Sequence, residues 1–86
     1  MDRATAKVLV IDDERSICIT CKRILESEGH AVEYCLSGLE GVRTAARGDH
    51  DVVLLDLKMP DLSGMEALEQ IRGARPDVTV IIITGY

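Results

Sequence analysis

Four short apolar runs along the chain predict four β-strands. They occupy residues 7–12, 31–36, 51–56 and 78–83. Three of the runs are almost purely aliphatic, which is typical of strands buried on both faces of a parallel sheet. The run at 31–36 is interrupted by Glu33, which indicates a strand at the edge of the sheet.

The segments between these runs carry apolar residues at helical spacing and predict three α-helices. The first opens at residues 12–14 and ends before Gly29, a residue type common just past a helix C-terminus. Capping boxes of the form Ser-x-x-Glu at 37–40 and 63–66 begin the other two helices, and Gly48 ends the second. The expected buried faces comprise Ile17, Cys21, Ile24 and Leu25 in the first helix, Leu39, Val42 and Ala46 in the second, and Met65, Leu68 and Ile71 in the third.

The order β-α-β-α-β-α-β predicts an α/β fold. Alternating strands and helices favour parallel strands joined by right-handed crossovers. We therefore expect a doubly wound sheet with helices on both faces, in three layers. No linker, low-complexity segment or internal repeat interrupts the pattern, so residues 1–86 are expected to form a single domain.

Composition narrows the possible classes of function. The net charge of −5 argues against nonspecific binding to nucleic acid or to an anionic membrane, and it leaves room for a cation site. No apolar run approaches the roughly 18 residues of a transmembrane helix. Residues 1–7 lack the apolar stretch of a signal peptide, so we expect a cytoplasmic protein.

Cys18 and Cys21 form a Cys-x-x-Cys pair, and Cys35 is the third cysteine. An odd number of cysteines without a secretion signal argues against a disulfide framework. The pair falls inside a helical pattern and no second pair completes a zinc set, which favours ordinary helix residues over redox or metal chemistry. The two histidines, His30 and His50, precede strands and are expected at the surface.

Polar residues stand at the carboxyl ends of three predicted strands: Asp12 with Asp13, Asp56, and Thr84. Those ends share one edge of a parallel sheet, so the three carboxylates meet in one crevice if the first strand lies between the second and third. Their repulsion favours a divalent cation, and Mg²⁺ usually takes one or two carboxylates together with phosphate oxygens. Each residue alone could be a helix cap, a turn residue or a strand residue, but their coincidence favours a site for Mg²⁺ and a phosphoryl group.

Three motifs carry a family resemblance. They read Val-Leu-Val-Ile-Asp-Asp-Glu at 8–14, Leu-Leu-Asp-Leu-Lys-Met-Pro-Asp-Leu-Ser-Gly at 54–64 and Ile-Ile-Ile-Thr-Gly-Tyr at 81–86. In this order and spacing they resemble the receiver domains of response regulators in two-component signalling. The sequence around Asp56 and Thr84 is most similar to receivers of the nitrogen-regulator type, which precede σ54-dependent activator modules.

The resemblance implies a flavodoxin-like sheet of strand order 2-1-3-4. It also implies a signalling phosphoacceptor, with at most self-phosphorylation and self-dephosphorylation at Asp56. A sensor histidine kinase would supply the phosphoryl group. Mg²⁺ would be held by Asp12, Asp13, Asp56 and the backbone carbonyl of Lys58, and Thr84 would bind the phosphoryl group and switch position. The loop beside the site would be shaped by Met59, Pro60 and Gly64.

One departure from the family concerns its C-terminal part. Receiver domains have five strands and five helices, with a Lys that grips the phosphoryl group before the fifth strand and an aromatic switch residue on it. The pattern here offers no residue for either role. The resemblance thus implies an incomplete receiver, residues 1–86, which would serve an output domain, expected to be transcriptional, in a longer protein. Residues 78–83 would then be a bare apolar edge, so self-association through it is expected.

Two other functions stay open. A haloacid-dehalogenase-like phosphatase also uses a strand-end Asp, Mg²⁺ and a Thr. It needs an acid two residues after the nucleophile, however, and Lys58 stands there. An interaction module without phosphorylation would need none of the site chemistry. Turnover of a phosphate ester would distinguish the phosphatase from a receiver.

Overall fold

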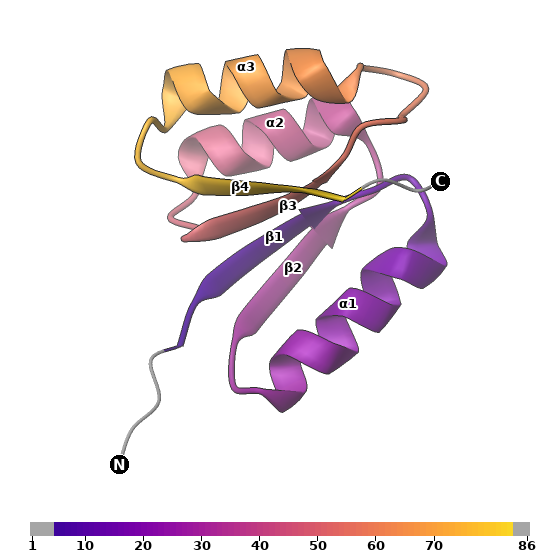
Figure 1. Ribbon diagram of the computed structural model, residues 1–86, viewed down its shortest axis with the longest axis vertical. Coiled ribbons are helices and arrows are strands. Elements are labelled where there is room, and N and C mark those ends of the chain that lie inside the picture. Colours follow the sequence, from indigo (N-terminus) through magenta and orange to yellow (C-terminus); the bar gives the residue numbers. More distant parts are fainter. Residues whose placement is uncertain (1–4, 84–86) are drawn as a thin grey trace.

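The computed structural model describes residues 5–83 as a parallel sheet between two layers of helices (Figure 1). Its elements are β1 (Lys7–Ile11), α1 (Arg15–Ser27), β2 (Ala31–Cys35), α2 (Gly38–Arg47), β3 (Val52–Asp56), α3 (Gly64–Ala74) and β4 (Thr79–Ile83). The strands all pair in parallel, in the order β2-β1-β3-β4. The predicted α/β class and strand order are confirmed, and β2 lies at an edge as Glu33 indicated.

The helices divide unequally between the two faces of the sheet. Among residues 5–83, α2 and α3 lie side by side over one face, while α1 lies alone over the other, beside β1 and β2 (Figure 1). On the α1 face, Leu54 of β3 is only partly buried and Ile81 of β4 is 48% exposed. Within the described part of the chain, the β4 end of that face is therefore open.

Side chains alternate between the two faces of each strand and build two aliphatic clusters. The cluster under α2 and α3 includes Leu9, Ile11, Val53, Leu55 and Ile71, each fully buried. On the opposite face, side chains from β1 and β2 pack against the fully buried Cys18 of α1. Branched aliphatic residues fill both clusters, which suits a chain with only 2% aromatic residues.

The predicted starts of α2 and α3 and the predicted ends of α1 and α2 agree with the structure, whereas α3 runs to Ala74, past Gly73, before which it was expected to stop. Ser37 precedes α2 and its hydroxyl accepts the N–H of Glu40 at 3.2 Å, and Ser63 accepts the N–H of Glu66 before α3 at 3.1 Å. Gly29 follows α1 with φ +95°, in the left-handed region that an L side chain rarely adopts. Local hydrogen bonding thus starts and stops these helices where the sequence indicates.

The buried faces of the helices were predicted only in part. Ile24, Leu39, Ala46 and Met65 are exposed, whereas the buried helix residues are Cys18, Gly38, Gly41, Ala45, Gly64, Ala67 and Ile71. The reason is close packing on the sheet. A Cβ on Gly41 would lie 2.6 Å from Ile11 Cγ2, so only glycine allows α2 to approach β1 this closely. Large apolar residues at helical spacing therefore do not mark the contact face of α2.

The surface prediction for His50 is wrong. Its side chain is only 5% exposed and its Nε2 lies 2.5 Å from Glu33 Oε1 of β2. The guanidinium of Arg75 donates to the backbone oxygens of Ala45, Gly48 and His50 in the same region. His30 is half-buried and its Nδ1 accepts the N–H of Ala6 at 3.0 Å. Both histidines thus join structural elements.

Candidate functional site

Three carboxylates meet at the carboxyl edge of the sheet. Asp12 and Asp13 follow β1 directly and Asp56 is the last residue of β3. β1 and β3 are neighbours with Ile11 opposite Leu55, so the residues that follow emerge side by side. One oxygen from each carboxylate lies within 4.8 Å of the other two.

The two buried members of this cluster, Asp12 and Asp56, have fixed orientations. Asp12 Oδ1 accepts the N–H of Glu14 at 2.9 Å, and Asp56 Oδ1 accepts the N–H of Lys58 at 3.2 Å. The backbone of Asp12 is held as well, because its N–H donates to Cys35 O and its carbonyl accepts the thiol of Cys18. Asp13 is exposed and completes the cluster from the solvent side.

Electrostatics at this cluster favour the binding of a cation. Burial raises the pKa of Asp12, and the negative charges of Asp56 and Asp13 raise it further. The hydrogen bond from the Glu14 N–H lowers this pKa in part. A hard divalent cation would relieve the repulsion, and carboxylate oxygens are donors that Mg²⁺ accepts. The residues present therefore fit Mg²⁺.

The loop after β3 is tightly packed beside the carboxylates. Met59 is 8% exposed and belongs to the core under α2 and α3. The N–H of Gly64 donates to Leu57 O at 3.1 Å, and a Cβ on Gly64 would lie 2.9 Å from Asp56 O. Pro60 is exposed, and so is the side chain of Lys58. Thr84 lies outside the described residues.

One residue near the site was not singled out by the sequence. Asp61 accepts hydrogen bonds from Ser37 Oγ and from the N–H groups of Gly38 and Leu39. These partners precede it by 22 to 24 positions, so no local pattern signals the contact.

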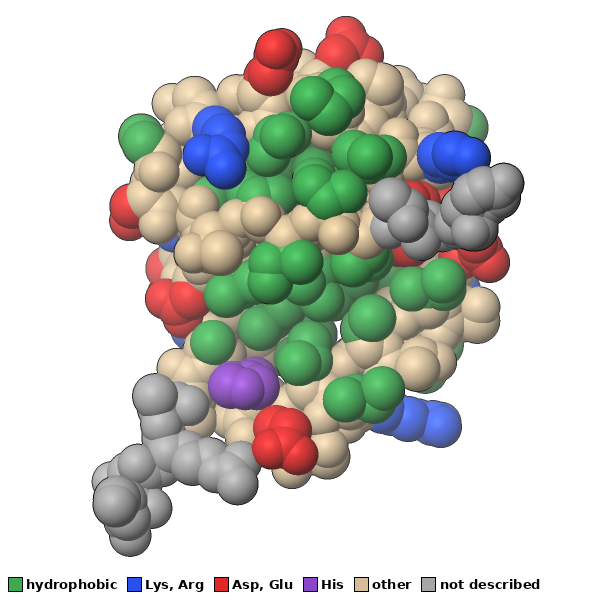
Figure 2. Space-filling view, in the orientation of Figure 1, with side chains coloured by type: hydrophobic (Ala, Val, Ile, Leu, Met, Phe, Trp, Pro, Cys, Tyr) green, Lys and Arg blue, Asp and Glu red, His purple; other side chains and the backbone are tan. Residues whose placement is uncertain are grey.

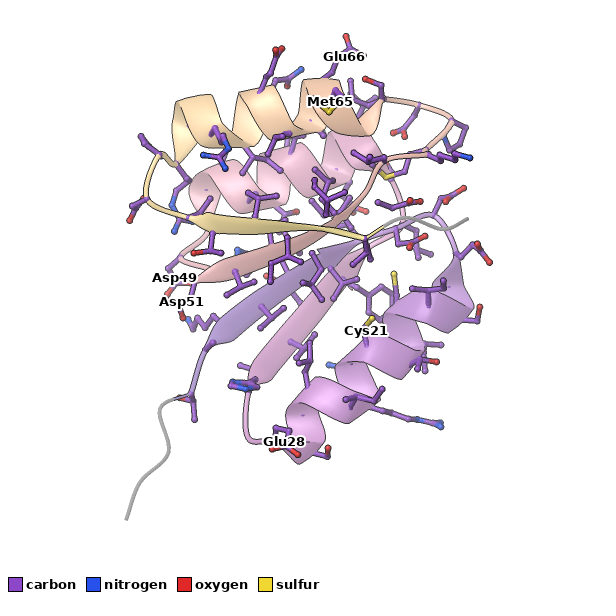
Figure 3. All side chains as sticks on the ribbon, in the orientation of Figure 1. Cys21, Glu28, Asp49, Asp51, Met65 and Glu66 are labelled. Carbon is purple, nitrogen blue, oxygen red and sulfur yellow. The ribbon has the colours of Figure 1, made fainter. Side chains whose placement is uncertain are left out.

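The Cys-x-x-Cys pair packs inside the molecule. Cys18 is fully buried, which raises the pKa of its thiol to about 11, and its Sγ donates to Asp12 O at 3.3 Å. Cys21 is half-buried on the side of α1 that faces the sheet (Figure 3). Cys18, Cys21 and Cys35 are all free thiols. The interpretation of the pair as ordinary helix residues is supported.

Comparison with known proteins identifies the family. Residues 8–86 match the response regulator receiver domain. The chain belongs to this family. It is 32% identical over 81 residues to the response regulator MprA of Mycobacterium tuberculosis, a match that covers 94% of this chain and 35% of MprA. The chain thus spans about a third of the length of this relative.

Two solved structures are similar to this receiver domain. The response regulator TrrA of Thermotoga maritima, solved in complex with Mg²⁺ and BeF, has a TM-score of 0.89 and 34% identity, covering 94% of this chain and 70% of that one. A response regulator from Burkholderia pseudomallei, solved with a phosphorylated aspartic acid and a calcium ion, has a TM-score of 0.87 and 28% identity, covering 94% of this chain and 48% of that one.

Each helix among residues 5–83 is too short or too polar to span a membrane.

Proposed function

We propose that this receiver domain accepts a phosphoryl group on Asp56 from a sensor histidine kinase, with Mg²⁺ bound at Asp12, Asp13 and Asp56. The observation that carries the proposal is the meeting of the three carboxylates within 4.8 Å at one edge of the sheet. Such a cluster is unfavourable by itself and favourable around a divalent cation.

The transfer is a displacement at phosphorus. A carboxylate oxygen of Asp56 forms a bond to the phosphorus of a phosphohistidine, the phosphorus–nitrogen bond breaks, and its electron pair returns to the imidazole of the kinase. The product is an acyl phosphate. Mg²⁺, when bound, supplies charge neutralisation for the phosphoryl oxygens.

The residues of this chain have separate roles in the proposal. The N–H of Lys58 orients the nucleophile through its bond to Asp56 Oδ1 at 3.2 Å. Asp12 and Asp13 hold the cation together with the backbone carbonyl of Lys58. The hydroxyl of Thr84 donates a hydrogen bond to a phosphoryl oxygen. Met59, Pro60 and Gly64 shape the loop beside them.

The related structures support this assignment at the level of chemistry. A receiver similar in fold holds Mg²⁺, and another carries a phosphorylated aspartic acid. The rival phosphatase would require an acid at position 58, and the exposed side chain there is a lysine. A transcriptional output domain stays a prediction, since the chain covers only 35% of MprA. The narrower likeness to nitrogen-regulator receivers also stays a prediction, since the relative reported above is MprA.

Acetyl phosphate is a phosphodonor that tests the proposal without a kinase. The chain is incubated with acetyl phosphate and Mg²⁺, the acyl phosphate is trapped with borohydride, and peptides are analysed by mass spectrometry. We expect label on Asp56, none in Asp56→Asn, and strongly reduced label in Asp13→Asn. Label at another residue would contradict the phosphoacceptor role, and repeated turnover of a phosphate ester would favour the phosphatase.

We also propose that a second copy of this chain pairs with the outer edge of β4. β3 is the one strand that pairs with β4 among the described residues. Ile81 and Ile82 are 48% and 38% exposed on its two faces, and apolar side chains gather on the side of the molecule where β4 lies (Figure 2). The strand is uncharged and lacks Pro, so nothing in it opposes pairing with an identical strand.

A further inference from the structure

The carboxylate of Asp61 caps α2 from the loop between β3 and α3. Its Oδ2 accepts Ser37 Oγ at 2.7 Å and the N–H of Leu39 at 3.0 Å, and its Oδ1 accepts the N–H of Gly38 at 3.1 Å. These bonds lower the pKa of Asp61 to about 2, so its carboxylate is fully ionised at neutral pH. A negative charge is favourable there, since the N-terminus of a helix is positive.

Asp61 satisfies half of the donors at this helix end. The first four N–H groups of an α-helix have no partner within the helix. In α2, Gly38 and Leu39 of this set donate to Asp61 and Glu40 donates to Ser37 Oγ, whereas the first bond within the helix runs from Gly41 to Ser37 O. Loss of Asp61 would leave two of these four donors without their protein partner.

The contact extends beyond the hydrogen bonds. A Cβ on Gly38 would lie 3.0 Å from Leu62 Cβ and 3.2 Å from Met59 Cε, two side chains of the same loop. The loop therefore lies directly on the first turn of α2. Gly38 leaves room for this approach, and the carboxylate of Asp61 provides its hydrogen bonds.

The same loop supplies backbone groups to the carboxylate cluster. The N–H of Lys58 bonds Asp56, and the N–H of Gly64 closes the loop on Leu57 O. In the chain Asp61 lies between these two attachments, and both its carboxylate and the core-packed Met59 contact the start of α2 at Gly38. The position of the Lys58 backbone thus depends on how the loop is held at α2.

We propose that Asp61 is a positioning residue, which fixes the loop carrying the Lys58 backbone by binding the N-terminus of α2. The proposal rests on the proposed Mg²⁺ site, where the Lys58 carbonyl is a ligand. Outer residues that orient metal ligands typically change metal affinity by about 10–100-fold. Because Asp61 acts through the backbone, we expect an effect at the lower end, about tenfold.

The test compares Asp61→Ala and Asp61→Asn with a matched control, Asp49→Ala. Asp49 is also exposed and accepts a hydrogen bond, from Lys7 Nζ at 2.7 Å, but it lies at the opposite edge of the sheet (Figure 3). Mg²⁺ affinity is measured by calorimetry well below each melting temperature. We expect about tenfold weaker binding in Asp61→Ala, a smaller loss in Asp61→Asn, which keeps one acceptor oxygen, and wild-type affinity in Asp49→Ala.

A second readout does not depend on Mg²⁺. Amide hydrogen exchange by NMR should show faster exchange at Lys58, Gly38 and Leu39 in the Asp61 variants, and no change at Lys58 in Asp49→Ala. If the wild type binds no Mg²⁺, the proposed function fails. The positioning role is then tested only by the hydrogen-exchange rate of the Lys58 amide. If folded Asp61→Asn binds Mg²⁺ with wild-type affinity and its Lys58 amide exchanges at the wild-type rate, the positioning role of Asp61 is refuted. If Asp61→Ala does not fold, Asp61→Asn and Ser37→Ala are compared with Asp49→Ala in the same two measurements.

Discussion

Asp12 directly follows β1 and Asp56 is the last residue of β3, and each has a carboxylate oxygen within 4.8 Å of one on the other. The parallel pairing of β1 with β3 produces this contact, because Ile11 and Leu55 stand opposite each other and the chain leaves both strands at the same edge. Both side chains are nearly fully buried, at 2% and 4% exposed. The metal-free protein therefore contains a repulsion that a cation would remove.

Replacing Asp12 with Asn should stabilise the metal-free protein and weaken its response to Mg²⁺. Asn removes one charge and keeps an oxygen for the Glu14 N–H. We expect a melting temperature about 2–5 °C higher without metal, the shift that a fraction of a kcal/mol produces in a domain of this size. Excess Mg²⁺ should raise the wild-type melting temperature and raise that of the variant much less.

The pH dependence of that difference follows from the raised pKa of Asp12. A carboxyl whose pKa is raised on folding favours the folded state below its ordinary value of 3.8, and this contribution is lost as pH rises through the higher folded pKa. The advantage of Asp12→Asn should thus be absent near about pH 3 and present near about pH 7. An equal advantage at both pH values would contradict the electrostatic origin.

Asp61 should show the opposite dependence on pH. Its pKa is lowered to about 2 by the N–H of Leu39, the hydroxyl of Ser37 and the N–H of Gly38. Its contribution to stability is complete above the ordinary value of 3.8 and is lost as pH falls toward about 2. Urea denaturation should find Asp61→Asn less stable than wild type near neutral pH, with the two converging in acid. A constant difference would argue against a charged cap.

Gly41→Ala should destabilise the fold. The added methyl group would lie 2.6 to 2.7 Å from three carbons of the fully buried Ile11 side chain, and overpacking of this kind typically costs about 1–3 kcal/mol. Gly73→Ala in α3 is the control, since nothing lies within 4 Å of its Cβ position. In Gly73→Ala the better helix propensity of Ala should raise the free energy of unfolding by about 0.5–1 kcal/mol. Chemical denaturation measures both, and equal effects would refute the packing argument.

The cysteines should be slow to react in the folded protein. Burial raises the pKa of Cys18 to about 11 and also raises the pKa of Cys21 and Cys35. At neutral pH we therefore expect thiol reagents to label Cys21 slowly and the fully buried Cys18 only after denaturant is added. Mass spectrometry of labelled peptides gives the rates. Rapid labelling of Cys18, or a Cys18–Cys21 disulfide in mild oxidant, would contradict this packing.

The β4 edge should make the chain self-associate. Light scattering coupled to gel filtration is expected to give a mass well above the 9.4 kDa of one chain. Ile81→Lys places a charge on the open edge and should shift the mass toward one chain. Ile24→Lys, at a 58% exposed position on α1, should not. A wild-type mass of one chain across concentrations would refute pairing through β4.

The sequence by itself determined the features that depend on neighbouring residues. Strand and helix order, the caps at Ser37 and Ser63, and the left-handed Gly29 follow from alternation of side chains, short-range hydrogen bonds and backbone sterics. Asp12 and Asp56 were predicted at the carboxyl ends of two parallel strands, which share one edge of the sheet. That the two residues meet there required the strand order 2-1-3-4, which the family resemblance implied and the local sequence did not.

The tertiary structure decided which residues meet across long separations. α2 packs closely on β1 because Gly41 leaves room for the side chain of Ile11. Ile11 belongs to another element, so the sequence of α2 alone does not reveal this contact. His50 is buried because β2 supplies Glu33 beside it. Asp61 caps a helix that begins 23 positions earlier, at Gly38, since the fold brings the loop onto that helix end. Each of these contacts forms only when separate elements pack together, so hydrophobic periodicity along the chain does not predict it.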